Sequence, residues 1–335
     1  MQDLVTVAVD AQGGDGGPEP DLEGIAMALE EDPSLLVLAC GQPRVIDDFV
    51  DAHERCIGLP CGEPILMGEH PAQAVRTKRD SSIVLGCKAV KDGLAQGFFS
   101  TGSTGACLVS ATLNIGRIKG VKRPAIGVMV PSDGHPTLLL DVGANSDCKP
   151  EYLVQFAKMG SVYVRRVLGV EDPRIGLLNI GTEESKGSVL VQEAYERMSR
   201  HVSGFRGNCE SKAMLRGDFD VVVTDGFTGN VCLKTMEATA SMVMGKVKGA
   251  LVSSIKAKLG ALMVKGALMR VKEELDPDEF GGSPLLGVNG VCIIGHGSSG
   301  PVAVKNGILA AAREIRADVA SDIREAIDGR DETVA

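Results

Sequence analysis

The 335-residue sequence lacks the features that define several large classes of protein. It opens on MQDLVTVAVDA, which has no basic region followed by a long apolar stretch, so we expect a first strand here and not a signal peptide. No segment reaches the roughly 18 apolar residues of a membrane-spanning helix. The nine cysteines include no CxxC pair, and their odd number leaves at least one thiol unpaired. Together these absences predict a protein of a reducing, cytoplasmic compartment.

The sequence also lacks an excess of positive charge. Its formal net charge of -9, from 35 basic and 44 acidic residues, speaks against a nucleic-acid partner, because such binding depends on neutralising phosphates. Acidic residues are absent from position 238 to position 272, where seven basic residues give +7 and leave -16 for the remainder. The segment predicts contact with an anionic membrane surface, docking of an acidic protein, or packing on the body or a second subunit. Its candidate contact residues are Leu251, Ile255, Lys256, Lys258, Leu259 and Leu262.

The common nucleotide-binding and catalytic motifs are missing as well. No GxGxxG opens the first expected helix, which argues against a dinucleotide-binding domain. Residues 181–188 (GTEESKGS) approach a P-loop, but the lysine stands before glycine and two glutamates would repel polyphosphate. Without a GxSxG motif, and with only five histidines, no nucleophile triad can be assembled. The absence of HxxxH and CxxC spacings leads us to expect neither a metal nor a cofactor.

What the sequence does contain is the pattern of an α/β fold. Short runs rich in Val, Ile and Leu alternate with amphipathic stretches, which is typical of a mostly parallel sheet with helices on both faces. The expected strands are residues 5–9, 34–39, 97–100, 125–130, 137–141, 174–180, 219–224 and 291–294. Helices are expected after Pro18 and Pro301 and from positions 81, 103, 150, 187 and 230. The helical stretch 230–275 contains four glycines, so we expect it to break into at least two helices that project from the body.

Glycine accounts for 42 residues and gathers in loops that directly follow the expected strands. Six such loops occur, at residues 10–18, 100–105, 141–145, 179–187, 224–230 and 295–300. A single loop of this kind is more often a tight turn than a ligand site. All six mix glycine with polar or charged residues, and the carboxyl ends of parallel strands are where anions bind. We therefore predict one anion-binding site, lined by Asp10, Gly13, Gly14, Asp15, Ser100, Gly102, Ser103, Thr104, Gly105, Asn145, Gly181, Thr182, Gly226, His296 and Ser298.

Taken together, the loops resemble one family, the PlsX-type phosphate acyltransferases of bacterial phospholipid synthesis. The resemblance covers essentially the whole chain. It rests on VDAQGGDGGP (9–18), RTKRDSS (76–82), STGSTGA (100–106), RPAI (123–126), LLDVGANSDCKPEYLVQFAKMGSVY (139–163), GLLNIGTEESKG (176–187), TDGFTGNVCLKT (224–235) and GGSPLLGVNGVCIIGHGSS (281–299). This chain departs from the family at Gly16, where histidine is usual, and at Ser103, where asparagine is usual. Neither histidine nor asparagine can then be indispensable at these positions, unless a neighbouring residue substitutes for it.

The resemblance implies a single Rossmann-like α/β/α domain over residues 1–335, with three layers and a projecting lysine-rich amphipathic segment at 238–275. It implies transfer of a fatty acyl group from acyl carrier protein to inorganic phosphate, which yields an acyl phosphate for phospholipid synthesis. It further implies a homodimer that associates peripherally with the inner face of the cell membrane.

Such a reaction fits the residues that are present. Phosphate is already anionic and a thiolate, with a pKa near 8.5, can leave, so direct attack on a thioester needs no protein nucleophile. It needs a cation and hydrogen-bond donors instead. We predict Lys186 as the cation, Asn230 as a donor and Asp225 as the residue that orients one of them. A solvated loop lysine and a turn aspartate are the competing interpretations of Lys186 and Asp225.

Two other functions fit the same loops. A phosphate acetyltransferase-like enzyme that uses a short acyl-coenzyme A would need the anion site but no membrane contact. A non-catalytic anion-binding protein or membrane scaffold would keep the fold alone. The basic apolar segment disfavours the first alternative, and the presence of Lys186, Asp225 and Asn230 disfavours the second.

Overall fold

The computed structural model describes residues 4–274 and 280–329 of the chain. The described residues form one 11-stranded sheet in the order β3-β2-β1-β4-β11-β10-β5-β6-β9-β7-β8. Its strands are β1 (Val5–Asp10), β2 (Leu35–Gly41), β3 (Cys56–Pro60), β4 (Gly97–Ser100), β5 (Ala125–Val130), β6 (Thr137–Leu140), β7 (Ile175–Leu178), β8 (Phe205–Cys209), β9 (Val221–Val223), β10 (Ser283–Leu286) and β11 (Val291–Ile294).

Helices connect most of these strands. They are α1 (Glu19–Glu31), α2 (Pro43–Asp51), α3 (Pro71–Thr77), α4 (Ser82–Lys91), α5 (Thr104–Ser110), the π-helix η1 (Ala111–Ile115), α6 (Pro150–Leu168), α7 (Val189–His201), α8 (Ser211–Leu215), α9 (Gly226–Leu251), α10 (Ile255–Glu274), α11 (Pro301–Arg316) and α12 (Val319–Asp328).

All eight strands expected from the sequence are present, and β3, β8 and β10 are additional. The strands β3 and β8 lie at the two edges of the sheet. Their sequences, CIGLP and FRGNC, contain the Gly, Pro and polar residues that edge strands tolerate, so they show no buried apolar run. Strand β10 includes Pro284, and because proline is uncommon inside strands this segment was not recognised as a strand from the sequence.

The direction of the strands changes in the middle of the sheet. Strands β3, β2, β1, β4 and β11 are mutually parallel, as are β6, β9, β7 and β8. Between the two sets, β10 is antiparallel to β11, β5 to β10 and β6 to β5. Three reversals leave the two parallel sets with opposite nominal directions, which decides where their carboxyl ends lie.

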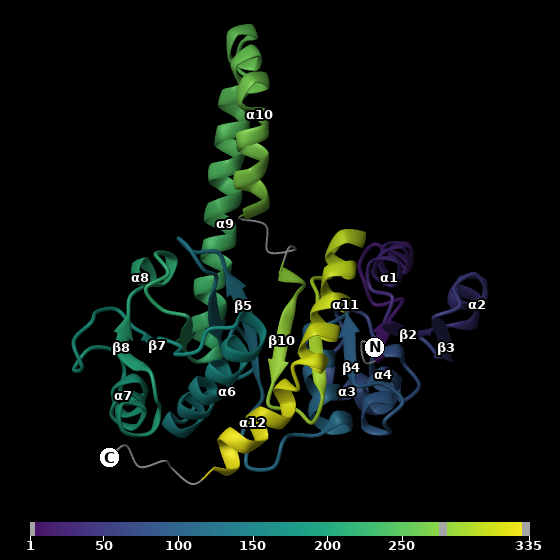
Figure 1. Ribbon diagram of the computed structural model, residues 1–335, viewed down its shortest axis with the longest axis horizontal. Coiled ribbons are helices and arrows are strands. Elements are labelled where there is room, and N and C mark those ends of the chain that lie inside the picture. Colours follow the sequence, from purple (N-terminus) through teal and green to yellow (C-terminus); the bar gives the residue numbers. More distant parts are fainter. Residues whose placement is uncertain (1–3, 275–279, 330–335) are drawn as a thin grey trace.

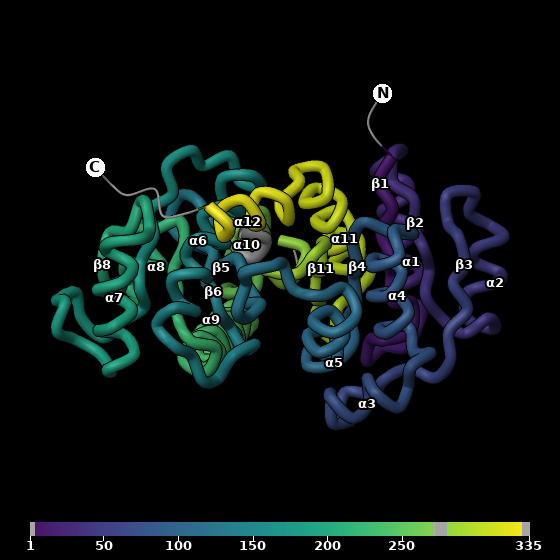
Figure 2. Tube along the Cα trace, turned by 90° about the horizontal axis from the view of Figure 1, so that it is seen from below, coloured from purple at the N-terminus to yellow at the C-terminus, as the bar shows by residue number. Residues whose placement is uncertain are grey.

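Helices cover both faces of the sheet, which makes the three-layer α/β/α architecture expected from the sequence. Figure 2 shows α3, α5 and α9 on one side of the sheet and α11 and α12 on the other. The first side is filled by an apolar cluster that spans both parallel sets, from Phe98 and Cys107 to Leu139 and Val222. On the second side, one cluster packs α1 and α11 on the β1 half, and another packs α6, α7 and α12 on the β6 half.

The helices α9 and α10 form a hairpin that projects from the body (Figure 1). This confirms the projecting, broken helical stretch, although its predicted last residue, Leu275, lies outside the described residues. The predicted helix start at Asn230 was wrong by four residues. The helix begins at Gly226, because the Asp225 carboxylate caps it by accepting a hydrogen bond from the Thr228 N–H at 2.9 Å. Within the described ranges, no helix is long and apolar enough to cross a membrane.

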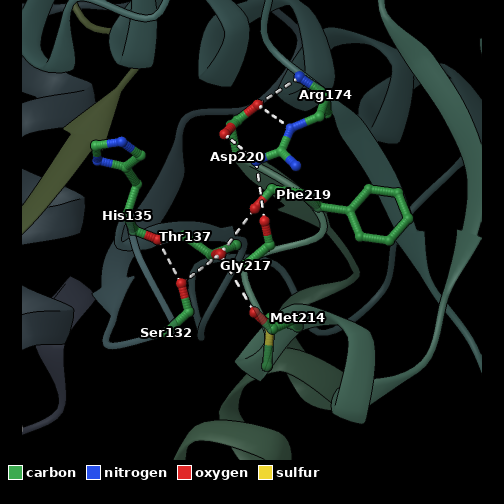
Figure 3. Close-up of polar contacts among 8 residues, drawn as sticks. All are labelled: Ser132, His135, Thr137, Arg174, Met214, Gly217, Phe219 and Asp220. Atoms are coloured by element: carbon green, nitrogen blue, oxygen red, sulfur yellow. Dashed lines mark hydrogen bonds and ion pairs between the residues drawn. The ribbon is translucent and has the colours of Figure 1, made fainter.

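A polar network orders the amino ends of β6, β7 and β9 (Figure 3). Arg174, just before β7, donates two side-chain hydrogen bonds to Asp220, just before β9, at 2.9 and 2.7 Å. The Thr137 hydroxyl at the start of β6 donates to the Phe219 carbonyl at 2.8 Å. Burial would raise the pKa of Asp220, but the hydrogen bonds and charge of Arg174 outweigh it and lower that pKa.

A buried carboxyl group lies where the two halves of the second helical layer meet. Glu314 on α11 is 3% exposed and shares a hydrogen bond with the Tyr163 hydroxyl on α6. Its Oε1 atom has no partner in the described part of the chain. Beside it is a cavity of about 10 Å³, lined also by residues of β10, β11 and α12. Burial raises the pKa of Glu314 to about 8, so this carboxyl is neutral at pH 7.

Candidate active site

The six glycine-rich loops fall into two groups, each at the carboxyl ends of three neighbouring parallel strands. The first loop group, residues 10–18, 100–105 and 295–300, follows β1, β4 and β11. The second loop group, residues 141–145, 179–187 and 224–230, follows β6, β7 and β9. No hydrogen bond connects the two groups within residues 4–274 and 280–329. Each group is therefore built locally by its own strands.

The first loop group is held together by two buried aspartates. The Ser100 hydroxyl donates to Asp10 Oδ2 at 2.8 Å, and the Thr101 hydroxyl donates to Asp21 Oδ1 at 2.9 Å. Asp10 ends β1 and Asp21 lies in the first turn of α1, so these bonds tie the loop after β4 to both ends of the loop after β1. The Gly13 backbone packs so closely on Asp10 that an added Cβ would lie 2.2 Å from its Oδ2.

Both aspartates are in surroundings that favour the neutral acid. Burial raises the pKa of Asp10, although the hydrogen bond from Ser100 opposes the shift. Burial, followed by the negative charge of Asp10, raises the pKa of Asp21 to about 8. The Asp21 Oδ2 atom has no partner among the residues described. Asp10 and Asp21 thus brace the loops by accepting hydrogen bonds from Ser100 and Thr101.

The third loop of this group is closed by its own side chains. The His296 ring Nδ1 lies 2.8 Å from the Ser298 hydroxyl, and the His296 N–H donates to the Ser299 hydroxyl at 3.2 Å. Both His296 and Ser298 are exposed. A backbone bond of 2.8 Å from the Asp15 N–H to the Gly297 carbonyl joins this loop to the loop after β1. The three loops therefore form one continuous surface.

The second loop group is organised around Asp141, which is fully buried at the end of β6. Its Oδ1 accepts hydrogen bonds from the N–H groups of Gly143 and Ala144 at 3.1 and 2.9 Å. Its Oδ2 accepts from the backbone and the side-chain amide of Asn145, both at 2.8 Å. The Asn145 amide also donates to the Pro124 carbonyl at 2.8 Å. The contacts of Asn145 are thus those of a residue that shapes the loop, and its predicted contact with substrate stays a prediction.

The loop after β9 is clamped to the loop after β6. The Gly226 N–H donates to the Asn145 carbonyl at 2.7 Å. An added Cβ on Gly229 would lie only 1.9 Å from the Asp141 carbonyl oxygen, so glycine is required at this close approach. The exposed Asn230 lies beside the same loop, since a Cβ on Gly143 would be 3.3 Å from its amide nitrogen. The start of α9 thus holds Asp225 and Asn230 against the loop that Asp141 braces.

Lys186 lies in the neighbouring loop, after β7. Pairing of Leu177 with Val223 makes β7 and β9 adjacent, so the loops that follow them emerge side by side. The Lys186 carbonyl accepts a hydrogen bond from the Asn179 amide at 3.1 Å, which fixes the loop backbone. The Lys186 side chain is exposed and runs along Gly181. Its ammonium group has no ion pair or hydrogen bond among the residues that the structure describes.

Comparison with known proteins agrees with this architecture. Residues 5–322 match the family model described as "Fatty acid synthesis protein". A phosphate acyltransferase of Acidobacterium capsulatum is 45% identical over 321 residues, which cover 94% of this chain and 95% of that protein. One from Desulfitobacterium hafniense is 44% identical over 323 residues, with 95% and 96% covered. The chain belongs to the phosphate acyltransferase family.

Solved structures share the fold of this phosphate acyltransferase at much lower identity. A phosphotransacetylase from Streptococcus pyogenes superposes with a TM-score of 0.57 at 18% identity, covering 93% of this chain and 94% of that one. A branched-chain phosphotransacylase from Enterococcus faecalis gives 0.58 at 16% identity, with 93% and 99% covered. The Rossmann-like α/β/α fold expected from the sequence is confirmed.

The structure distributes the predicted site residues of the phosphate acyltransferase between the two loop groups. The first group contains Asp10, Gly13, Gly14, Asp15, Ser100, Gly102, Ser103, Thr104, Gly105, His296 and Ser298. The second contains Lys186, Asp225 and Asn230, together with Asn145, Gly181, Thr182 and Gly226. Within the first, Ser103 also caps α5 by accepting from the Ala106 N–H at 3.4 Å.

Sequence reasoning missed three residues that position these loops: Asp21, Thr101 and Asp141. Asp21 lies on the buried face of α1 together with Gly24, Ile25 and Ala28. An acidic residue in register with an apolar helical face was the available signal. Asp141 was visible at the end of an apolar strand, but nothing in the sequence revealed that it accepts four hydrogen bonds from its own loop.

Proposed function

We propose that this phosphate acyltransferase transfers a fatty acyl group from the thioester of acyl carrier protein to inorganic phosphate. A phosphate oxygen attacks the thioester carbonyl carbon, a C–O bond forms and the C–S bond breaks. The acyl phosphate leaves with the acyl group, and the carrier thiolate takes up a proton. The product is an acyl phosphate that supplies phospholipid synthesis.

The observation that carries the proposal is the ammonium group of Lys186, which has no ion pair or hydrogen bond among the described residues and lies in the loop next to the one that holds Asp225 and Asn230. Phosphate and the oxyanion that develops on the thioester are both negative, so their approach must be offset by a cation. Lys186 is the candidate, because its backbone is fixed while its side chain remains available. Glu183 and Glu184 in the same loop carry negative charge, which disfavours a polyphosphate.

Asn230 and Asp225 complete the proposed centre. The exposed Asn230 amide can donate to phosphate or to the oxyanion from its place beside Gly143. Asp225 accepts from the Thr228 N–H and hydroxyl at 2.9 and 2.7 Å, so its carboxylate is committed to the start of α9. We propose that it orients Asn230 by fixing that helix start, which makes Asp225 a positioning residue.

The first loop group is proposed to belong to the same site. Neighbouring strands of a sheet are rotated relative to one another by roughly 20–25°. Five strand-to-strand intervals separate β4 from β9 in the sheet, so the strand direction turns by roughly 100–125° between them. Combined with the reversal of direction, the carboxyl ends of the two groups then diverge by roughly 55–80° instead of 180°. We propose that a substrate with a long prosthetic arm spans the two groups.

The hairpin α9–α10 is proposed to contact an anionic membrane surface from the cytoplasmic side. It projects from the body, and Ile255, Leu259 and Leu262 on it are 79%, 61% and 71% exposed. Lys256 and Lys258 are exposed between them, whereas Leu251 is half-buried. Exposed apolar residues among lysines suit a surface of apolar chains below anionic headgroups. We also propose a homodimer as the working unit.

The reaction is tested by incubating the protein with an acyl-carrier-protein thioester and phosphate and trapping acyl phosphate with hydroxylamine. A coenzyme A thioester serves as the second donor. Lys186→Ala is expected to lower kcat by about 10²–10³-fold with the fold intact, as loss of one charge-stabilising group does elsewhere. The exposed lysine of α8, in Lys212→Ala, is the matched control and should keep normal turnover. Near-normal turnover of Lys186→Ala would remove this lysine from the mechanism, and preference for the short coenzyme A thioester would favour the acetyltransferase alternative.

Membrane contact is tested by co-sedimentation with liposomes that contain anionic lipid. Leu259→Glu is expected to reduce the bound fraction, because a carboxylate cannot enter the apolar layer and is repelled by the headgroups. Leu94→Glu is the matched control, since Leu94 is 63% exposed on the body. Equal binding of both variants and the unmodified protein would exclude insertion of Leu259.

A further inference from the structure

A basic patch lies on the otherwise acidic body, around α3 and α4. Residues 76–91 contain five basic residues and one acidic residue, a net charge of +4, whereas the body outside this segment and outside residues 238–272 is at -20. Arg76 and Arg79 are exposed at and just after the end of α3. The Arg76 guanidinium has no ion pair or hydrogen bond among the described residues, and Arg79 uses only its Nε, which donates to the Arg76 carbonyl at 3.2 Å. Both guanidinium groups are thus available to carboxylates of a partner.

Two exposed apolar side chains belong to the same corner of the molecule. Leu66 and Met67 precede α3 and are 61% and 42% exposed. Lys78 fixes their loop, because its ammonium donates to the Pro64 carbonyl at 2.9 Å and pairs with Glu69 at 2.7 Å. The Glu69 carboxylate in turn accepts from the Leu66 N–H at 2.7 Å. We give the name α3 patch to the four exposed side chains Leu66, Met67, Arg76 and Arg79.

The α3 patch adjoins the first loop group. Met67 packs on the loop after β11, since a Cβ added to Gly297 would lie 2.6 Å from the terminal methyl carbon of Met67. Pro71, the first residue of α3, packs on the loop after β4, at 2.6 Å from a Cβ added to Gly105. Figure 2 shows α3 beside α5, on the side of the sheet that also carries α9. A protein bound to the patch would therefore have two loops of the first group at its edge.

We propose that the α3 patch is the docking surface for the acyl carrier protein, whose thioester arm then passes the first loop group on its way to the candidate site. The inference rests on the proposed function and adds the place where the donor binds. An acidic carrier protein is attracted by the patch and repelled by the rest of the body, so charge selects this surface. Arginine and methionine are also among the residues enriched at protein interfaces.

The hairpin α9–α10 carries more positive charge, but that charge lies farther from the loops. Lys256 and Lys258 on α10 follow the far end of α9, whose 26 residues span about 39 Å. A carrier protein bound there would be separated from the loops by the length of that helix, whereas the α3 patch contacts two of them. The position of the patch therefore favours it over the hairpin as the docking surface.

The patch is tested by reversing its charge and measuring the Kd for an octanoyl carrier protein by calorimetry, without phosphate so that no transfer occurs. The test variant is Arg76→Glu/Arg79→Glu. Its matched control is Arg197→Glu/Arg206→Glu, which makes the same change of net charge at exposed positions of α7 and β8. Leu66→Ser tests the apolar part of the patch without changing charge. Thermal unfolding shows that each variant is folded.

Arg76→Glu/Arg79→Glu is expected to raise the Kd by about tenfold or more, and its control should bind within about twofold of the unmodified protein. Leu66→Ser should raise the Kd by about fivefold, as loss of about one buried methylene group does. Raising NaCl from about 50 to about 300 mM should weaken binding of the unmodified protein more than that of the charge-reversed variant.

Equal Kd values for the test variant and its control would overturn the proposal. So would a weaker Kd for Lys256→Glu/Lys258→Glu alone, because the carrier protein would then dock on the hairpin. Loss of liposome binding by Arg76→Glu/Arg79→Glu with an unchanged Kd would also overturn it, since the patch would then face the membrane. If the unmodified protein binds the octanoyl carrier protein but makes no acyl phosphate when phosphate is added, the proposed reaction fails and the docking surface stands.

Discussion

Replacement of Glu314 by Gln tests whether a neutral carboxyl at the seam of the fold makes stability depend on pH. The Glu314 carboxyl is 3% exposed and hydrogen-bonded to the Tyr163 hydroxyl, and its pKa is raised from 4.5 to about 8. In the unfolded chain it releases its proton near pH 4.5, whereas in the folded chain it retains the proton until about pH 8. Between these values the unfolded state binds fewer protons, so stability falls as pH rises and then levels off.

The size of the effect follows from the shift. A difference of 3.5 between the folded value of about 8 and the ordinary 4.5 corresponds to about 5 kcal/mol, at about 1.4 kcal/mol per unit. This is an upper bound. The adjacent cavity of about 10 Å³ is close to the minimum for one water molecule, and its hydration would lower the penalty for the ionised form. We expect Glu314→Gln to be of similar stability at about pH 5 and about 2–5 kcal/mol more stable than the unmodified protein at about pH 8.5.

The assay is urea unfolding at these two pH values, with free energies obtained by linear extrapolation. Glu193→Gln on α7 is the matched control, since Glu193 is exposed, and it should show no pH-dependent difference. A Glu314→Gln variant whose stability relative to the unmodified protein is the same at both pH values would refute the reasoning. It would mean that Glu314 is already ionised in the folded protein.

Two further predictions concern the backbone clamp and the polar network. Gly229→Ala should destabilise the fold by about 2 kcal/mol or more, because its Cβ would lie 1.9 Å from the Asp141 carbonyl oxygen. Gly245→Ala on the same helix meets open space and should stabilise the fold by up to about 1 kcal/mol. Thermal unfolding of the two variants distinguishes these outcomes. Asp220→Ala should lower the urea midpoint at neutral pH, because the pairing of Asp220 with Arg174 is lost. Below the lowered pKa of Asp220 the substitution should have no such effect, since the carboxylate is then protonated and the pairing is already lost. An equal loss at both pH values would contradict the role of that charge.

Much of the fold could be predicted because its central strands are buried on both faces. Runs such as VVV at β9 and AIGVMV at β5 are unmistakable. The edge strands β3 and β8 are half-solvated, so their composition does not differ from that of loops. The start of α9 was misplaced because an asparagine and an aspartate five residues apart are both good caps, and only the hydrogen bonds of Asp225 decide between them.

The glycine loops were all located from the sequence, but their grouping was not. Which strand ends meet depends on the antiparallel pairings of β10 and β5, and four-residue segments such as SPLL carry no sign of direction. The hydrogen bonds that Asp21 and Asp141 accept inside the loops could not be predicted from the sequence either. Asp21 and Asp141 lie far in sequence from Thr101 and Ile126, the residues they hold, and no short motif records such a contact.

Because helix α9 is long and uninterrupted, a small tilt at its start displaces its far end. Its 26 residues form a rod of about 39 Å that begins at the Asp225 cap and ends at the turn into α10, with no loop to absorb a bend. A tilt of about 5° about the capped end displaces the far end by about 3 Å. Conversely, any force that fixes the tip limits how far the capped end can pivot between Gly143 and Asn145. The far end of α9 and the loops around its capped start are in this way mechanically linked.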